Sequence, residues 1–256
     1  MIPRLFIDVS LSLDLTIPLS PDHAHYLRAV LRREVGNEIL MFNGVDGEYS
    51  ATIAALSKKG GTVRVTGQTQ AFSPSPPVHL YFAPVKRTPT EYIIQKATEI
   101  GVHSFRPVLT DRTTSSRLNV DRLGAIGIEA AEQCGRLDIP TMQEASKLNL
   151  ALEKISPETK ILFCDEAGDD PSQEWGGRDG RGAPVLECLQ AQTSETTPWI
   201  ILTGPEGGFS AEERLYLRAH PQVVAATLGP RILRADTAAI AALVLWQAAI
   251  GDWQGM

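Results

Sequence analysis

The sequence predicts a two-domain α/β protein, in which a small β-rich N-terminal unit precedes a larger unit built on a parallel sheet. Three observations predict this fold. The first 70 residues hold short strand-like runs separated by glycine turns. The segment AFSPSPP at 71–77 carries three prolines and serves as a linker. After it, apolar strand-like runs alternate with helical patterns, which is typical of a parallel sheet with helices on both faces. We therefore expect domains at 1–71 and 78–256.

In the N-terminal unit, strands are expected at 4–7, 38–42, 48–54 and 62–70, with glycine turns at 43–44 and 60–61. Ser20-Pro21 predicts a short helix, because serine is a favoured N-cap and proline fits the first helical position. The residues expected on its apolar face are Tyr26, Leu27, Val30 and Leu31, and those expected outside are Arg28, Arg32 and Arg33. The unit should be a small barrel or sheet with one helix.

In the C-terminal unit, strands are expected at 78–84, 105–109, 161–164, 199–203 and 223–228, and helices at 88–100, 119–135, 184–191 and 236–250. Thr88-Pro89-Thr90-Glu91 predicts a capping box that starts the first helix, and Gly101 ends that helix. The stretch at 168–182 is rich in Gly and Asp and is expected to be an exposed loop. In such a fold, ligands bind beyond the carboxyl ends of the strands.

The composition, 43% hydrophobic and 21% charged, fits an ordinary globular protein. No apolar run reaches the roughly 18 residues of a membrane span, and the N-terminus MIPRLFIDVS shows no signal peptide. Cys134, Cys164 and Cys188 form no zinc or CxxC pattern, and the five histidines lack ligand spacing. We therefore expect a protein of the reducing cytoplasm that binds no metal.

The net charge of −6 argues weakly against nucleic acid, but phosphate binding needs only one local basic face. Basic residues do cluster in the sequence. The groups are Arg28, Arg32 and Arg33, then Lys86 and Arg87, then Arg231 and Arg234. Either they contact RNA phosphates or they are an ordinary solvated surface, and charge alone leaves both interpretations open.

Two buried strands near the C-terminus each end in a Gly-Pro turn, in LTGPEGGFSAEE at 202–213 and LGPRILRADTAA at 228–239. Gly204, Gly207 and Gly208 can take positive φ or let a ligand approach the backbone. Ser210 and Glu213 predict a capping box. The spacing fits neither a Walker A motif nor GxGxxG. Two such turns are more than chain reversal needs, and together they favour a ligand site.

The last helix has no charged residue from 237 to 250. A helix that is apolar all round must be buried on nearly every side. It is therefore either a central core helix or one that a partner subunit covers in part, and the pattern favours neither.

These motifs resemble those of the RsmE family, bacterial 16S rRNA uridine N3-methyltransferases of the SPOUT, or α/β-knot, superfamily. Besides the two turns, YIIQKATEIGV, DRTTSSR and EAAEQCGR agree with the family, and RLFID, HYLRAVLR and FNGVDGEY resemble its PUA-like RNA-binding domain. The likeness covers almost the whole chain. The chain departs from the family at 235–237, where Ala-Asp-Thr replaces the more usual Thr-Glu-Thr, and in a longer, more polar segment at 166–197.

The resemblance implies a PUA-like β-barrel followed by a SPOUT domain whose chain forms a trefoil knot, an exception to the rule against knots. It implies that S-adenosylmethionine binds bent in the knot, with its adenine held largely by backbone groups. The implied cofactor residues are Leu202, Gly204, Leu228, Gly229, Ile232 and Leu233. It also implies a homodimer whose interface includes the last helix.

The implied activity is methylation of N3 of a specific uridine, of the uridine 1498 type, in 16S rRNA of the small ribosomal subunit. Arg112 and Arg234 are candidates for stabilising the deprotonated base, and Glu206 for removing or orienting the proton. Arg112 contacting only phosphate, Arg234 bridging subunits and Glu206 accepting backbone amides are the structural alternatives. Arg28, Arg32, Arg33, Lys86 and Arg87 are the candidates for RNA contact.

Three other functions stay open at this point. A SPOUT enzyme that methylates tRNA would share the glycine turns. A non-catalytic RNA-binding assembly factor would keep a basic face but would not need a nucleoside site. A nucleotide-dependent oxidoreductase is disfavoured, because GxGxxG and its following acidic residue are missing.

Overall fold

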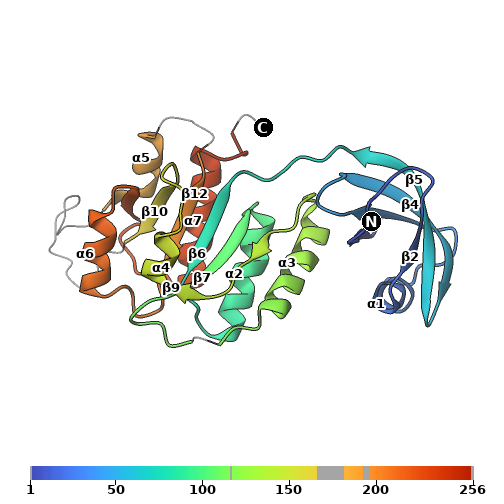
Figure 1. Cartoon of the computed structure of the whole chain (residues 1–256), viewed down its shortest axis with the longest axis horizontal. Coiled ribbons are helices and arrows are strands. Elements are labelled where there is room, and N and C mark those ends of the chain that lie inside the picture. Colours follow the sequence, from blue (N-terminus) through green and yellow to red (C-terminus); the bar gives the residue numbers. More distant parts are fainter. Residues whose placement is uncertain (1, 116, 166–181, 193–196, 255–256) are drawn as a thin grey trace. The chain divides into compact units, whose positions relative to one another are not determined.

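The computed structural model describes residues 2–115, 117–165, 182–192 and 197–254 (Figure 1). The chain divides into two units, Met1–Pro74 with Ala131–Ile139, and Ser75–Ala130 with Pro140–Met256. This division differs from the one expected from sequence, because it assigns 131–139 to the N-terminal unit. Of the expected exposed loop at 168–182, all but the last residue lies outside the described residues.

The N-terminal unit contains a five-stranded sheet in the order β1-β3-β4-β5-β2. Its strands are β1 (Arg4–Phe6), β2 (Thr16–Leu19), β3 (Glu38–Phe42), β4 (Glu48–Ser57) and β5 (Gly60–Gln70). β1 pairs with β3 in parallel and the other pairs are antiparallel. The sequence analysis missed β2, a four-residue edge strand that contains Pro18, a residue that sheets tolerate at an edge.

The helix of this unit begins as predicted but continues differently. Ser20 caps α1 (Pro21–His25) by accepting a hydrogen bond from the His23 amide. The next residues, Tyr26–Val30, form a π-helical turn, in which the Leu31 amide donates to the Tyr26 carbonyl at 3.0 Å. The wider turn rotates the following side chains. Val30 is therefore 58% exposed rather than buried, and Arg28 and Arg33 are half-buried rather than outside.

A half-buried arginine ties residues 131–139 to the N-terminal unit. The Arg4 Nε donates to Glu48 at 2.6 Å, and its terminal nitrogens donate to the carbonyls of Ala131, Glu132 and Arg136. These carbonyls lie at and beyond the end of α3 (Val120–Cys134), where the last backbone acceptors of a helix need partners. Arg4 thus satisfies them with a charged donor.

The C-terminal unit is built on a parallel sheet in the order β11-β13-β10-β12-β6-β7-β8, with β9 beside β7. Its strands are β6 (Val78–Phe82), β7 (Ser104–Leu109), β8 (Thr141–Met142), β9 (Ser146–Lys147), β10 (Lys160–Cys164), β11 (Ala183–Pro184), β12 (Trp199–Thr203) and β13 (Val223–Thr227). Every pair in it is parallel. The predicted α/β class is confirmed.

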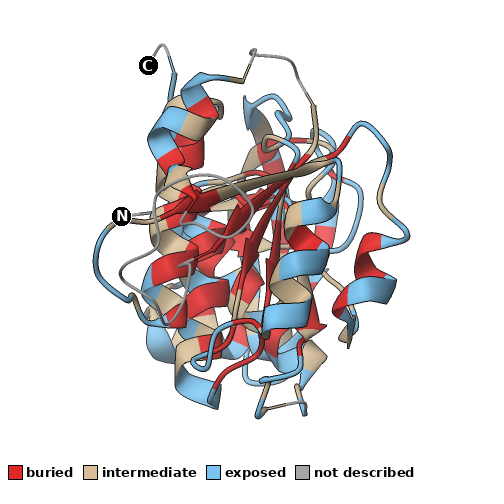
Figure 2. Cartoon of the chain, turned by 90° about the vertical axis from the view of Figure 1, so that its left-hand side faces the viewer, coloured by how far each residue is buried: buried red, intermediate tan, exposed pale blue. Residues whose placement is uncertain are grey.

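Helices cover both faces of this sheet, as predicted, and Figure 2 shows the buried strands between them. Along β12, Trp199 and Ile201 join the core against α2 (Arg87–Glu99), α5 (Val185–Gln190) and α7 (Ala235–Ala249). Ile200 and Leu202 join the opposite core against α4 (Leu148–Leu152) and α6 (Ala211–Ala219). Successive side chains of a strand point to opposite faces of the sheet, so β12 contributes residues to both cores.

The predicted capping box at Thr88–Glu91 is wrong. α2 begins at Arg87 with Lys86 as N-cap, and no side chain caps it. Thr90 instead hydrogen-bonds the backbone of Val85, and Glu91 accepts from Arg87 and Arg122. The Glu91 carboxylate is thus bound by two arginines, one of them from α3, and is not used as a cap. Gly101, with φ of +93°, follows the helix end as expected.

Candidate functional site

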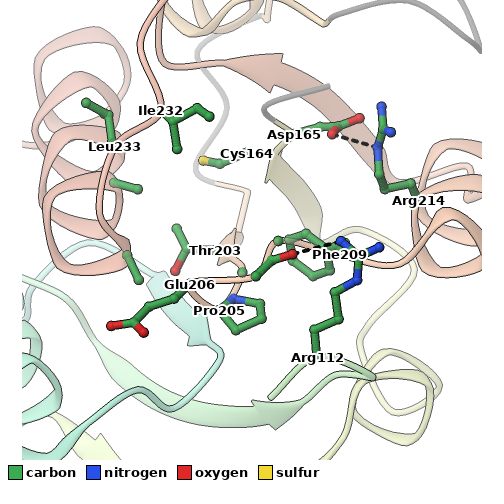
Figure 3. Close-up of a pocket in the computed structure, with 15 residues that line it drawn as sticks. Arg112, Cys164, Asp165, Thr203, Pro205, Glu206, Phe209, Arg214, Ile232 and Leu233 are labelled. Carbon is green, nitrogen blue, oxygen red and sulfur yellow. Dashed lines mark hydrogen bonds and ion pairs between the residues drawn. The ribbon is translucent and has the colours of Figure 1, made fainter. Parts of the chain in front are cut away.

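A cavity of about 180 Å³ opens at the carboxyl ends of β10 and β12, beside the chain that precedes α7 (Figure 3). It lies beyond the carboxyl ends of the strands, where open α/β sheets bind ligands. Its lining residues come from four segments of the chain: Arg112; Cys164 and Asp165; Thr203–Phe209 with Arg214; and Ile232, Leu233, Ala235 and Ala238.

The first glycine turn, 204–208, is packed against the protein itself. A Cβ on Gly204 would lie 2.6 Å from the Phe209 ring, so the position admits no larger residue without a shift. Phe209 in turn packs edge-on against Phe163, with ring centroids 5.0 Å apart. Gly208 has φ of +67°, a conformation that favours glycine. The space beside Gly204 is therefore filled by a side chain of the protein and not left open to a ligand, contrary to the sequence-based expectation.

The helix that follows this turn is firmly capped. Ser210 and Glu213 form the predicted capping box of α6. Glu213 Oε1 also accepts from the Asp111 amide at 2.9 Å, and the Ser210 hydroxyl donates to Asp111 Oδ2 at 2.6 Å. The cap therefore joins two segments of the site, the turn before α6 and the turn that carries Arg112.

Of the three predicted catalytic residues, two line the cavity. The Arg112 Nη1 donates to the Gly207 carbonyl at 2.8 Å, which fixes the guanidinium against the first turn. Glu206 is exposed, and Figure 3 shows its side chain directed away from Arg112. Arg234 is the exposed N-cap of α7 and is not among the lining residues.

The predicted cofactor residues fall into two groups. Gly204, Ile232 and Leu233 line the cavity. Leu202 is fully buried in β12, and Leu228 and Gly229 form the start of the second turn, where Gly229 has φ of +118°. Ile232 is 85% exposed, the largest exposure of any large apolar residue that the structure describes. The second turn therefore packs less closely against the rest of the protein than the first.

Sequence reasoning missed an ion-pair cluster in the cavity wall. Asp165, 2% exposed, follows β10 and accepts from the Arg214 Nε at 3.0 Å and the Arg218 Nε at 2.6 Å. Two signals were available. An acidic residue directly follows a buried strand, and two arginines four positions apart lie on one face of α6.

The predicted RNA-binding residues lie in both units. Arg28, Arg32 and Arg33 belong to the N-terminal unit, and of these Arg32 is exposed. Lys86 and Arg87 lie at the start of α2 and are exposed. Arg87 pairs with Glu91 at 2.7 Å. The hydrogen bonds from Arg122 and Arg87 lower the pKa of Glu91 to about 2, so this carboxylate is charged at neutral pH. Its negative charge partly neutralises the positive charges of Arg87 and Arg122.

Two kinds of feature are absent from the described part of the chain. No cluster of three or more His, Cys, Asp or Glu side chains suited to a metal occurs among the described residues. No helix that these residues form is both long and apolar enough to span a membrane.

Two protein families match different parts of the chain. A family profile described as RNA methyltransferase domain matches residues 73–247, and one described as RNA methyltransferase PUA domain matches 19–66. Ribosomal RNA small subunit methyltransferase E of Rickettsia conorii is 30% identical over 94% of this chain and 93% of its own length. The protein of that name from Bacillus subtilis is 27% identical, covering 89% and 88%.

Solved structures agree with this fold. A putative methyltransferase from Legionella pneumophila, solved with bound SAM, has a TM-score of 0.79 and 29% identity, covering 98% of this chain and 99% of its own. The Neisseria gonorrhoeae ribosomal RNA small subunit methyltransferase E has a TM-score of 0.82 at 24% identity, covering 99% and 100%, and supports the fold. The chain therefore belongs to the RNA methyltransferase family that includes ribosomal RNA small subunit methyltransferase E.

Proposed function

We propose that this protein transfers a methyl group from S-adenosylmethionine to N3 of a uridine in 16S rRNA of the small ribosomal subunit. The observation that carries the proposal is the cavity between two glycine turns at the carboxyl ends of parallel strands. The names of the relatives support small-subunit ribosomal RNA as the substrate, and the SAM-bound Legionella structure supports the cofactor. Such a protein works in the cytoplasm, where ribosomal subunits are found.

The residues of the cavity fit a nucleoside. Ile232, Leu233 and Ala238 offer an apolar surface for a flat base, and the backbone of 203–208 offers polar groups at its edge. We propose that the backbone at Leu202, Gly204, Leu228 and Gly229 holds the adenine, with Ile232 and Leu233 against its face. The trefoil knot implied by the family resemblance belongs to this proposal.

Bound S-adenosylmethionine supplies an electrophilic methyl group whose leaving group is a neutral thioether, so no general acid is needed. Uridine N3 carries an imide proton, and its removal creates an anion shared by N3, O2 and O4. Arg112 is held on the Gly207 carbonyl and presents a fixed cation to such an anion. Glu206, on the other side of the turn, is the candidate for accepting or orienting the proton, and Arg234 is a second candidate cation.

RNA binding is assigned to basic residues of both units. Arg28, Arg32 and Arg33 would contact phosphates from the PUA unit, and Lys86 and Arg87 from the start of α2. Changing the first three to glutamine should weaken binding of a 16S rRNA fragment and flatten its salt dependence, because each lost phosphate contact lowers the slope by about one. Affinity for S-adenosylmethionine should not change. An unaltered salt slope would indicate that these arginines are ordinary solvated surface residues that do not contact RNA.

We further propose a two-fold homodimer through α7. Ala239, Ala242, Leu243 and Trp246 are buried in the core, whereas Ala241, Val244 and Ala248 on the other side of the helix are partly or fully exposed. Val244→Arg would bury an unpaired charge in the interface and should produce monomers in sedimentation experiments. Wild-type protein that sediments as a monomer and still methylates small subunits fully would contradict the dimer.

The direct test is methylation of purified small ribosomal subunits, with tRNA as the competing substrate. We expect N3-methyluridine in 16S rRNA only. Arg112→Gln should lower kcat about a hundredfold, because it removes one group that stabilises developing negative charge. Arg117→Gln is the matched control, an exposed arginine of the same segment that does not line the cavity. Methylated tRNA would favour the alternative SPOUT substrate, and RNA binding without cofactor binding would favour an assembly factor.

A further inference from the structure

The cavity has one apolar side and one cationic side. Figure 3 shows Ile232 and Leu233 on one side, Arg214 on the opposite side, and Cys164 and Asp165 between them. A ligand that fills this cavity should therefore have an apolar flat part at one end and a negative group at the other.

Arg214 is fixed through one edge of its guanidinium. The Nε donates to Asp165 at 3.0 Å, and the Asp165 side chain is only 3% exposed. The Nη1 and Nη2 atoms of Arg214 have no hydrogen-bond partner among the described residues, and the side chain is 27% exposed as part of the cavity lining. A guanidinium held in this way is oriented in advance and can bind an oxyanion with two parallel donors.

Arg218 provides an internal comparison. It lies one helical turn further along α6 and binds the same carboxylate, with its Nε 2.6 Å from Asp165 Oδ2. Its side chain is 5% exposed, and it is not among the lining residues of the cavity. Two arginines thus share one aspartate, but only Arg214 reaches the ligand space.

We propose that Arg214, positioned by Asp165, binds the α-carboxylate of S-adenosylmethionine and so selects a nucleoside that carries an amino-acid tail. This inference rests on the proposed function, because it assumes that the nucleoside lies against Ile232 and Leu233. The carboxylate is the only anionic group of this cofactor. Arg214 is therefore a specificity-determining residue, and Asp165 is a positioning residue that acts through it.

The test uses calorimetry to compare two ligands whose sulfur is a neutral thioether. S-adenosylhomocysteine carries the amino-acid tail and 5′-methylthioadenosine lacks it. In Arg214→Gln the Kd of S-adenosylhomocysteine should rise about tenfold, because a charge-assisted hydrogen bond is lost. The Kd of 5′-methylthioadenosine should stay within about twofold. Arg214→Lys, which keeps the charge, should lose less.

Arg218→Gln is the matched control, and it should leave the ratio of the two affinities unchanged whatever its effect on stability. The inference is overturned if both thioethers weaken together in Arg214→Gln, or if neither weakens. It is also overturned if Arg214→Gln lowers only the affinity for a 16S rRNA fragment, since the cation would then serve RNA phosphate. Wild-type protein that binds neither thioether would overturn the proposed function as well, which separates the two failures.

Discussion

The two glycine turns of the site differ in how the protein holds them. In the first, the Phe209 ring lies against Gly204, the Gly207 carbonyl accepts from Arg112, and the capping box of α6 closes the end. In the second, a Cβ added to Gly229 would meet no described atom within 4 Å, and Ile232 is 85% exposed. Contacts within the protein fix the conformation of the first turn. We expect the bound ligand to fix the conformation of the second.

Local sequence explains the difference. The first turn runs into Phe209 and Ser210, which supply a ring for packing and a helix cap. The second runs through Arg231, Ile232 and Arg234, all exposed, and α7 then starts without a side-chain cap. A segment with few buried apolar contacts and few hydrogen bonds opens at low free-energy cost. We therefore expect perturbations of the first turn to lower stability and perturbations of the second to lower ligand affinity.

The largest effect is expected from Asp165→Ala, which removes the anchor of α6 behind the first turn. Two guanidinium groups would lose their shared buried carboxylate, and the free energy of unfolding should fall by about 3 kcal/mol. Urea unfolding monitored by circular dichroism measures it. The control is Arg87→Gln in an exposed pair, which should have no measurable effect. Equal effects of the two substitutions would show that the buried cluster does not anchor α6.

Alanine substitutions at Gly204 and Gly229 compare directly how much each turn contributes to stability. Gly204→Ala should destabilise by about 2 kcal/mol, because the new methyl group overlaps the Phe209 ring. Gly229→Ala should cost about 1 kcal/mol from backbone strain alone, since its φ is +118° and the space around it is open. Gly124→Ala in α3, also in open space, should be neutral or stabilising. If Gly229→Ala proves the more harmful to stability, the ranking of the turns is wrong.

Removing the cap of α6 should have a smaller effect on stability and a specific effect on the site. Ser210→Ala should lower the free energy of unfolding by about 1 kcal/mol and also release Asp111, next to Arg112. Methylation kinetics should then show a fall in kcat. Ser20→Ala removes the N-cap of α1 in the other unit and should leave kcat unchanged. A fall in kcat for both variants would point to general destabilisation instead.

The smallest effect on stability is expected from Ile232→Ser. An 85% exposed side chain contributes little, so the free energy of unfolding should change by no more than about 0.5 kcal/mol. Affinity for S-adenosylmethionine should nevertheless fall severalfold in calorimetry, because the apolar face for the base is lost. Leu215→Ser, at a half-exposed residue of α6 outside the cavity, is the control. Unchanged cofactor affinity in Ile232→Ser would remove this residue from the site.

Sequence could predict what local patterns specify. The run from Trp199 to Thr203 reads as a buried strand, and Ser210 with Glu213 reads as a cap, because both signals lie within a few residues. Features that depend on distant partners were missed or wrong. The sequence analysis placed the start of α2 at a capping box, whereas the N-cap is Lys86, and no local motif indicated the π-turn after His25.

The same limit applies to the site. Arg112 and Gly204 could be placed near a ligand from their motifs, and both line the cavity. Asp165 and Arg214 are 49 positions apart, and no local period connects them. Their pairing needs the order of β10 beside β13 and the packing of α6, which only the fold supplies.

Hydrogen exchange of the backbone amides, with and without saturating S-adenosylmethionine, tests the contrast between the turns most directly. In the free protein, the amides of Gly208 and Ser210 should exchange slowly, because they donate to Pro205 and Glu213. The amides of Ile232 and Leu233 have no acceptor among the described residues and should exchange fast, then become protected when the cofactor binds. Slow exchange at Ile232 and Leu233 in the free protein, or no gain in protection with the cofactor, would contradict this account.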